Sequence, residues 1–217
     1  GLFLAAKGGY NDESHNHNDV GTCSVWFNQT PILIDAGVGT YTRQTFSGER
    51  YSIWTMQSDY HNLPMINGVP EKNGKNYKAT EVKVSKNSFS ANIATAYPKK
   101  AKVKEWIRSY KVKGNQVQIN DAFDLEESVA PNIINFMTWG KVDNPEKGKV
   151  YIQANDVKAQ LLYDANKFEL NVEPKELTDP KLSKVWGKTI YRLSFKAKQQ
   201  SDKGSYAFTL KEVIHSR

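Results

Sequence analysis

The chain has 217 residues, with 30 basic and 23 acidic side chains and a formal net charge of +7. This length is enough for one domain with a full hydrophobic core. The single cysteine, Cys23, excludes an internal disulfide and a zinc site built from several cysteines. No run approaches the ~18 apolar residues of a membrane helix, so no membrane span is predicted. The charge favours an acidic partner, although lysines spread along the chain also describe an ordinary solvated surface.

Apolar and polar residues alternate along most of the chain, which is the period of a β-strand rather than that of a helix. Residues 22–27 and 31–35 flank a polar turn at residues 28–30 and predict a first hairpin. Residues 41–60 are aromatic and polar without a clear period. They predict a long loop with a short helical turn, and loops of this length are often functional.

From residue 78 onward the predicted strands are short and closely spaced. They lie at residues 80–85, 89–97, 103–112, 117–123, 132–139, 150–154, 159–163, 167–172, 189–195 and 205–210. This pattern predicts an all-β fold, a large antiparallel two-sheet β-sandwich of the supersandwich type. Pro180 interrupts residues 176–184, so no helix is predicted there. The linker-like residues 173–184 leave room for a small C-terminal sheet or subdomain from about residue 185.

Three of the four histidines, His15, His17 and His61, lie in the first third of the chain, and Asp35 ends the first hairpin. Two imidazoles and one carboxylate are sufficient to hold zinc with an open fourth position. Ligands on neighbouring strands, about 4.8 Å apart, can converge on one ion. The same residues also suit surface histidines and a turn carboxylate, so their spacing alone leaves both readings open.

Two other metal-site templates match in part. The spacing of Gly9, His15 and His17 resembles the start of the cupin pattern, but no glutamate follows where cupins carry one. The two-histidine, one-carboxylate site of iron oxygenases is matched in part by His17, Asp19 and the distal His61. No arginine identifies itself as the partner of an oxo-acid cosubstrate.

Three segments in fixed order carry a family resemblance. Residues 3–9 (FLAAKGG), 13–21 (ESHNHNDVG) and 34–41 (IDAGVGTY) resemble the heparinase II/III-like family of polysaccharide lyases. Residues 60–63 (YHNL) and 66–69 (INGV) are similar to the family's His-Asn segment and the turn after it. The motif-bearing resemblance covers about the first seventy residues, and the remainder matches in its strand-rich character.

The resemblance implies a helical toroid followed by an antiparallel β-sandwich, and residues 1–217 correspond to the sandwich alone. The residues that it implies for a structural zinc are His17, Asp35 and His61. It also implies that His15 faces the catalytic cleft. Asn16 and Asn18 are expected either to orient His15 and contact substrate or to serve as turn-forming residues.

The implied reaction is β-elimination on an acidic polysaccharide that contains uronic acid, either a glycosaminoglycan or an alginate-like polymer, in the periplasm or outside the cell. The family's catalytic tyrosine belongs to the toroid, so it is expected outside this chain, in a helical domain of the same protein. The isolated sandwich is therefore expected to have little lyase activity.

Two alternatives remain at this point. One is a noncatalytic carbohydrate-binding or scaffold β-sandwich, in which Trp54, Trp106 and Trp186 stack on sugars, although core packing is the commoner role of tryptophan in such chains. The other is a cupin-like or iron-oxygenase metal enzyme. No nucleic-acid-binding motif is recognisable, so nucleic acid is not an expected partner.

Overall fold

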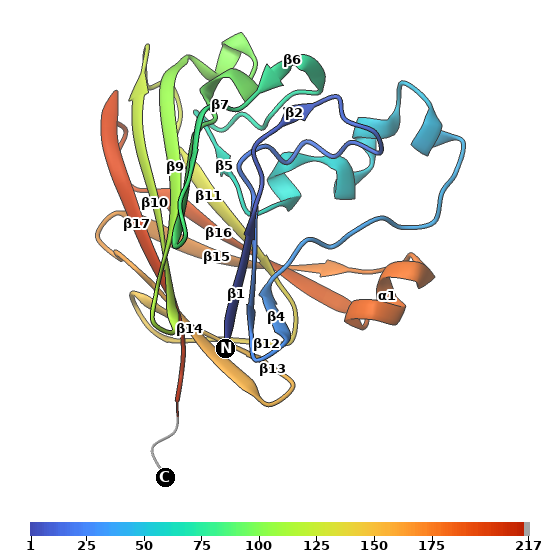
Figure 1. Ribbon diagram of the computed structural model, residues 1–217, viewed down its shortest axis with the longest axis vertical. Helices are drawn as coiled ribbons and strands as arrows, with labels where there is room; N and C mark the ends of the chain where they lie inside the picture. Colours follow the sequence, from blue (N-terminus) through green and yellow to red (C-terminus); the bar gives the residue numbers. More distant parts are fainter. Residues whose placement is uncertain (215–217) are drawn as a thin grey trace.

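The structure is a computed structural model that describes residues 1–214 (Figure 1). Its largest sheet is antiparallel and has eight strands. The strands are β7 (Thr80–Val84), β8 (Ser88–Asn92), β9 (Val103–Lys113), β10 (Gln116–Leu125), β12 (Lys141–Glu146), β13 (Lys149–Ala154), β14 (Val157–Tyr163) and β17 (Lys203–Glu212). Their order across the sheet is β12-β13-β14-β17-β10-β9-β8-β7.

Three smaller sheets accompany it. Their strands are β1 (Leu2–Ala6), β2 (Tyr10–Asn11), β3 (Cys23–Phe27), β4 (Thr30–Leu33), β5 (Pro64–Met65), β6 (Gly74–Lys78), β11 (Ile133–Thr138), β15 (Phe168–Glu176) and β16 (Thr189–Ala197). Four of these strands form a sheet in the order β15-β16-β11-β5. Another sheet has the order β1-β3-β4, and β2 pairs with β6.

The helical elements are short. One α-helix, α1 (Pro180–Trp186), precedes β16. The 3-10 helices are η1 (Gln44–Phe46), η2 (Arg50–Ser52), η3 (Trp54–Met56), η4 (Ser58–Tyr60), η5 (Ala94–Ala96) and η6 (Lys99–Ala101). Four of them occupy the long loop that the sequence predicts at residues 41–60, which lies beside the sheets at the right of Figure 1.

The predicted all-β sandwich is confirmed, because the inner faces of the sheets share one core. Aromatic rings from opposite sheets meet there: Phe208 of β17 lies 5.2 Å from Phe136 of β11 and 5.1 Å from Phe195 of β16 between ring centroids. Each aromatic pair of this kind adds about 0.5–1.5 kcal/mol beyond the apolar area that it buries. The alternation seen in the sequence therefore reflects one buried and one solvated face on each strand.

The structure corrects three expectations. Pro180 starts helix α1, because a proline fits the first helical position and Asp179 caps the helix by accepting the N–H of Lys181. The strand expected at residues 89–97 ends at Asn92, and the chain continues into η5. Within residues 1–214 no separate C-terminal sheet follows residue 185, since β16 and β17 belong to the four-stranded and the eight-stranded sheet.

The tryptophans proposed to stack on sugars are used in packing. Trp106 is fully buried and stacks on Phe123 with 4.9 Å between ring centroids. Trp186 is half-buried and donates its indole N–H to the carbonyl of Ala36. Trp54 lies edge-on to Tyr60. These contacts match the core role that is common for tryptophan, rather than a sugar platform.

A buried ion pair crosses the interior face of the large sheet. Arg108 of β9 lies directly opposite Asp121 of β10, and both side chains have 0% exposure. The guanidinium donates Nε to Oδ1 at 2.6 Å and Nη2 to Oδ2 at 2.8 Å, a two-pronged geometry. The indole N–H of Trp106 also donates to Asp121 Oδ1 at 2.7 Å. The pair therefore offsets the cost of burying its charges with several hydrogen bonds.

Asp121→Asn should lower the free energy of unfolding by about 3–5 kcal/mol, because it leaves the Arg108 charge buried without a counterion. Urea unfolding followed by circular dichroism measures this. The matched control is Glu127→Gln, which breaks the exposed pair between Lys102 and Glu127 and should cause no measurable loss. Equal stability of Asp121→Asn and the wild type would contradict the assigned role of the pair.

Candidate metal centre and catalytic groove

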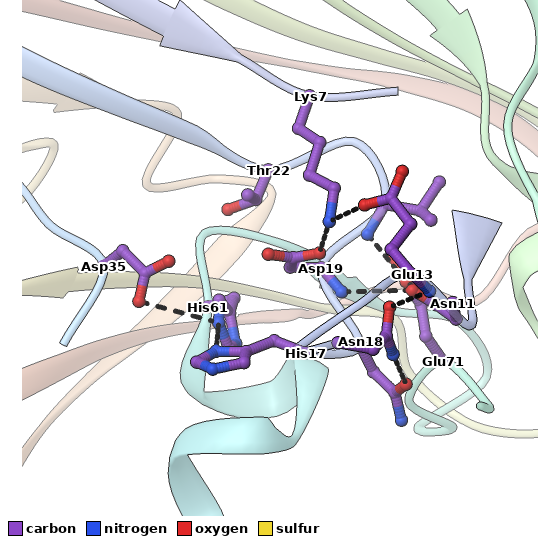
Figure 2. A network of polar contacts seen from close by, with 12 residues as sticks. Lys7, Asn11, Glu13, His17, Asn18, Asp19, Thr22, Asp35, His61 and Glu71 are labelled. Atoms are coloured by element: carbon purple, nitrogen blue, oxygen red, sulfur yellow. Dashed lines mark hydrogen bonds and ion pairs between the residues drawn. The ribbon is translucent and has the colours of Figure 1, made fainter. Parts of the chain in front are cut away.

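Three separate segments bring the predicted zinc ligands together (Figure 2). His17 lies in the loop between β2 and β3, Asp35 follows the end of β4, and His61 follows η4. One ligand atom from each side chain lies within 4.8 Å of the others. His17 and His61 are 8% and 2% exposed, whereas the Asp35 side chain is half-buried. The structure thus assembles the three side chains that the sequence motifs single out.

The His61 ring is oriented by a backbone contact. Its Nδ1 lies 2.8 Å from the carbonyl oxygen of Gln57, which can only accept a hydrogen bond. Nδ1 therefore carries the proton in the neutral ring, and Nε2 keeps its lone pair toward His17 and Asp35. A metal-binding imidazole is usually held in this way, with the second nitrogen bonded to a carbonyl or carboxylate.

The electrostatics prepare these groups as ligands. Burial lowers the pKa of His17, and the nearby His61 imidazole lowers it further, so the ring is neutral at pH 7. Burial by itself raises the pKa of Asp35, but the His61 imidazole and the N–H of Gly37 outweigh it and bring the pKa below its usual value. The lowered pKa of His17 and that of Asp35 both favour the deprotonated forms that divalent metal binding requires.

The donor set fits a tetrahedral ion. His17 Nδ1 and His61 Nε2 are 3.4 Å apart, and Asp35 Oδ1 is 3.8 Å from the same His61 nitrogen. Two nitrogen ligands about 2.0–2.1 Å from a tetrahedral zinc lie about 3.3 Å apart. Three ligands leave a fourth position open for water or another group. The residues present therefore suit zinc.

The other two metal templates do not assemble. Asp19, the carboxylate of the oxygenase-like triad, accepts the Lys7 ammonium at 2.5 Å and lies outside the cluster of His17 and His61. His15, which the cupin pattern requires as a ligand, is exposed and also lies outside the cluster. The candidate ligands are thus separated from the one exposed histidine of this loop.

His15 sits at the rim of an open groove of about 360 Å³. Its backbone has φ +57°, in the left-handed region that non-glycine residues seldom adopt. The next residue is fixed by Arg50, which donates Nε and Nη2 to the carbonyl oxygen of Asn16 at 3.1 and 2.9 Å. This double contact supports the strained turn that presents the His15 ring.

The groove is lined by Glu13, His15, Asn16, Thr45, Phe46, Ser47, Arg50 and Tyr51.

Asn16 and Asn18 are 5% and 4% exposed, and their side chains bond within the loop. The Asn16 amide donates to Asn18 Oδ1 at 3.4 Å and to the Tyr51 hydroxyl at 3.2 Å, and its oxygen accepts the N–H of Glu13. These hydrogen bonds show that both side chains stabilise the conformation of the loop. The predicted contact with substrate stays a prediction.

Sequence reasoning did not assign a role to Arg50 or to Glu71. Glu71 lies beneath the histidine loop, where its Oε1 accepts the Asn11 amide at 2.9 Å and the N–H of Val20 at 3.0 Å (Figure 2). Its Oε2 is buried without a partner. Both residues are remote in sequence from the loop that they support, and a lone arginine or glutamate carries no motif. Only the fold reveals their contacts.

Glu71→Gln should reduce the loss of stability as pH rises. Burial raises the pKa of Glu71 well above 4.5, and the charge of Asp19 adds to this effect. Between 4.5 and the raised value, the unfolded chain has released the proton and the folded chain still binds it, so stability falls with rising pH. Urea unfolding from pH 5 to 8 measures the slope. If the free energy of unfolding depended on pH in the same way for wild type and variant, the assignment would be contradicted. The control is Glu126→Gln, at an exposed position.

The comparisons with known proteins bear on the family and the fold of the chain. The family model described as "Heparinase II/III-like, C-terminal" matches residues 2–178. A solved structure of heparinase III, the BT4657 gene product, has a TM-score of 0.72 and 17% identity over 97% of this chain and 32% of that chain. Heparan sulfate lyase HepC from Pedobacter heparinus has a TM-score of 0.71 and 15% identity over 100% of this chain and 34% of that chain.

At these identities the two structures show a shared fold. The chain spans about one third of their length, 32% and 34%. No curated protein sequence gives a significant match. The family match, in contrast, covers most of the chain and includes every segment that carries the motifs. The chain therefore belongs to the heparinase II/III-like family, of which it forms the C-terminal β-sandwich.

Proposed function

We propose that this chain is the β-sandwich part of a lyase that cleaves a uronic-acid-containing polysaccharide by β-elimination. The observation that carries the proposal is the exposed His15, held at the rim of a groove beside a cluster of three metal-ligand side chains. The related structures are named for heparinase III and heparan sulfate lyase, so heparan sulfate is the first substrate to test. A polymer of this kind lies outside the cytoplasm, and we accordingly propose a periplasmic or secreted location.

In this proposal zinc is bound by His17, Asp35 and His61 and has a structural part. Bound zinc would join the histidine loop, the end of β4 and the segment after η4, in addition to the hydrogen bonds that already connect them through Asn62. His15 lies two residues from His17, so fixing His17 also limits the movement of the groove wall. The two histidines of the loop therefore have different parts, one in metal binding and one in proton transfer.

The proposed proton transfer is a β-elimination. His15 takes the C5 proton of the uronate, the electron pair left at C5 forms the C4–C5 double bond, and the C4–O4 bond breaks. The leaving O4 receives a proton from an acid. An imidazole is suited to accept a proton near neutral pH. Arg50, which lines the same groove, supplies positive charge near the uronate carboxylate, where charge grows as the C5 proton leaves.

The acid is expected on a helical domain outside this chain, in agreement with the implied position of the family's catalytic tyrosine. Tyr51 lines the groove, but its hydroxyl accepts the Asn16 amide and so contributes to holding the loop. The groove is open, and a second domain facing it would enclose the substrate and exclude water.

Zinc should be present at about one ion per chain after purification without added metal. Elemental analysis of His17→Ala and His61→Ala should show loss of most of it, because each variant removes one of three protein ligands. His15→Ala is the matched control, since His15 lies outside the cluster and the variant should keep its zinc. Full occupancy in either ligand variant would refute the assignment.

Unsaturated uronate products, followed by ultraviolet absorbance with heparan sulfate, should appear only when a helical domain upstream of residue 1 is present in the chain. In that longer protein His15→Ala should lower kcat by about 10²–10⁴-fold, the usual contribution of a general base. Tyr51→Phe should have a much smaller effect, because the proposed acid lies elsewhere. Strong lyase activity from the 217-residue chain alone would show that this division of roles is wrong.

A further inference from the structure

The outer face of the eight-stranded sheet gathers lysines that are far apart in the sequence. In one cross-strand row Lys113 of β9 lies opposite Gln116 of β10, Gln116 lies opposite Lys211 of β17, and Lys211 lies opposite Gln160 of β14. Adjacent strands are about 4.8 Å apart, so the backbones of Lys113 and Lys211 are roughly 10 Å apart. Residues directly opposite each other point to the same face of the sheet.

Two more lysines extend this row. Lys111 lies opposite Gln118 in the next outward-facing row, and Lys158 precedes Gln160 by two residues on β14. The intervening residues Val112 and Val117 and the cross-strand partner Leu210 point to the core. We name this surface the basic face, and it consists of Lys111, Lys113, Gln116, Gln118, Lys158, Gln160 and Lys211.

The charge of the basic face is not compensated. Within residues 1–214 none of its four lysines takes part in an ion pair, whereas Lys7, Lys102, Lys149 and Lys203 each have a carboxylate partner. Asp143 of β12 lies in the same cross-strand row but is separated from Gln160 by Tyr151, and it has no ion pair with these lysines. Glu212 follows Lys211 on β17 and accepts the Asn28 amide. Like charges held close together without partners repel, and a bound polyanion relieves this repulsion.

The residues between the lysines suit a sugar polymer. Gln116, Gln118 and Gln160 each offer an amide donor and an acceptor to hydroxyl groups, and they alternate with the lysines across the strands. Lys158 also lies over the ring of Tyr151 on the next strand, 4.4 Å from its centroid, which orders that ammonium group. The basic face thus combines fixed positive charge with neutral hydrogen-bonding groups on a sheet.

The basic face lies away from the groove. Figure 1 places β9, β10 and β17 on one side of the molecule and the loop that carries η1 and η2, which lines the groove, on the other. Among the described residues, no strand or helix covers the outer side of these strands in this view. A ligand on the basic face would therefore leave the groove accessible.

We propose that the basic face is a second binding surface for an acidic polysaccharide, separate from the groove at His15. The choice of polymer rests on the proposed function, and the positive surface itself rests on the strand register. Two attachment points on one polymer raise its effective concentration at the groove without any new contact there. The basic face would thus hold a long chain while the groove engages one of its uronates.

The test uses the 217-residue chain and heparan sulfate in affinity electrophoresis and calorimetric titration. The triple variant Lys111→Gln, Lys113→Gln, Lys211→Gln should bind about tenfold more weakly or worse, with a smaller dependence of affinity on salt. The control triple variant Lys75→Gln, Lys99→Gln, Lys100→Gln removes equal charge from exposed positions elsewhere and should change binding less than about twofold. Thermal unfolding verifies that both variants fold.

Equal weakening by the two triple variants would overturn the proposal, since binding would then follow net charge alone. Tighter binding of double-stranded DNA than of heparan sulfate at equal salt would also overturn it, in favour of a nucleic-acid surface. Failure of the lyase proposal would appear as absent turnover in the longer protein with this binding intact, so the two failures are distinguishable.

Discussion

The fully buried side chain of Asn62 is the contact on which the cluster of His17, Asp35 and His61 depends. Its amide nitrogen donates to the carbonyl oxygens of Cys23 at 2.7 Å and of Ile34 at 3.3 Å, and its oxygen accepts the N–H of Met137 at 2.6 Å. One side chain therefore joins β3, the end of β4 and β11. Because His61 directly precedes Asn62, and Asp35 directly follows Ile34, the same amide fixes the backbone at two of the three positions in the cluster.

The large sheet supports this arrangement from behind through the buried pair of Arg108 and Asp121. Arg108 Nη1 donates to the carbonyl oxygen of Asn62 at 3.0 Å and to the Tyr110 hydroxyl at 3.1 Å. Tyr110 in turn donates to the carbonyl oxygen of Gly21, where the histidine loop ends. A Cβ at Gly21 would lie 2.7 Å from the Ile93 side chain at φ +89°, so only glycine allows this close approach. The site thus rests on charges and hydrogen bonds in the core.

Several parts of this architecture follow from local sequence. Alternation predicts the strands, and the turn at Asn28 and Gln29, both with positive φ, is the kind that joins two strands in a tight hairpin. Predictions about where an element ends are less secure. The sequence alone predicts that Pro180 breaks a helix, but at the first helical position its missing N–H has no cost. The strand expected to reach residue 97 stops at Asn92, whose side chain accepts the N–H groups of Ala94 and Trp106.

The sequence by itself determined the fold class and singled out the three side chains that cluster, because period-two alternation and short motifs are local signals. Tertiary structure decided where each group lies. It separated His15 from His17 by turning the backbone, and it brought Arg50 under the loop through contacts that no spacing encodes. It also gathered lysines that look evenly spread along the chain onto one face. The physical reason is that strand pairing sets neighbours by register rather than by distance in sequence.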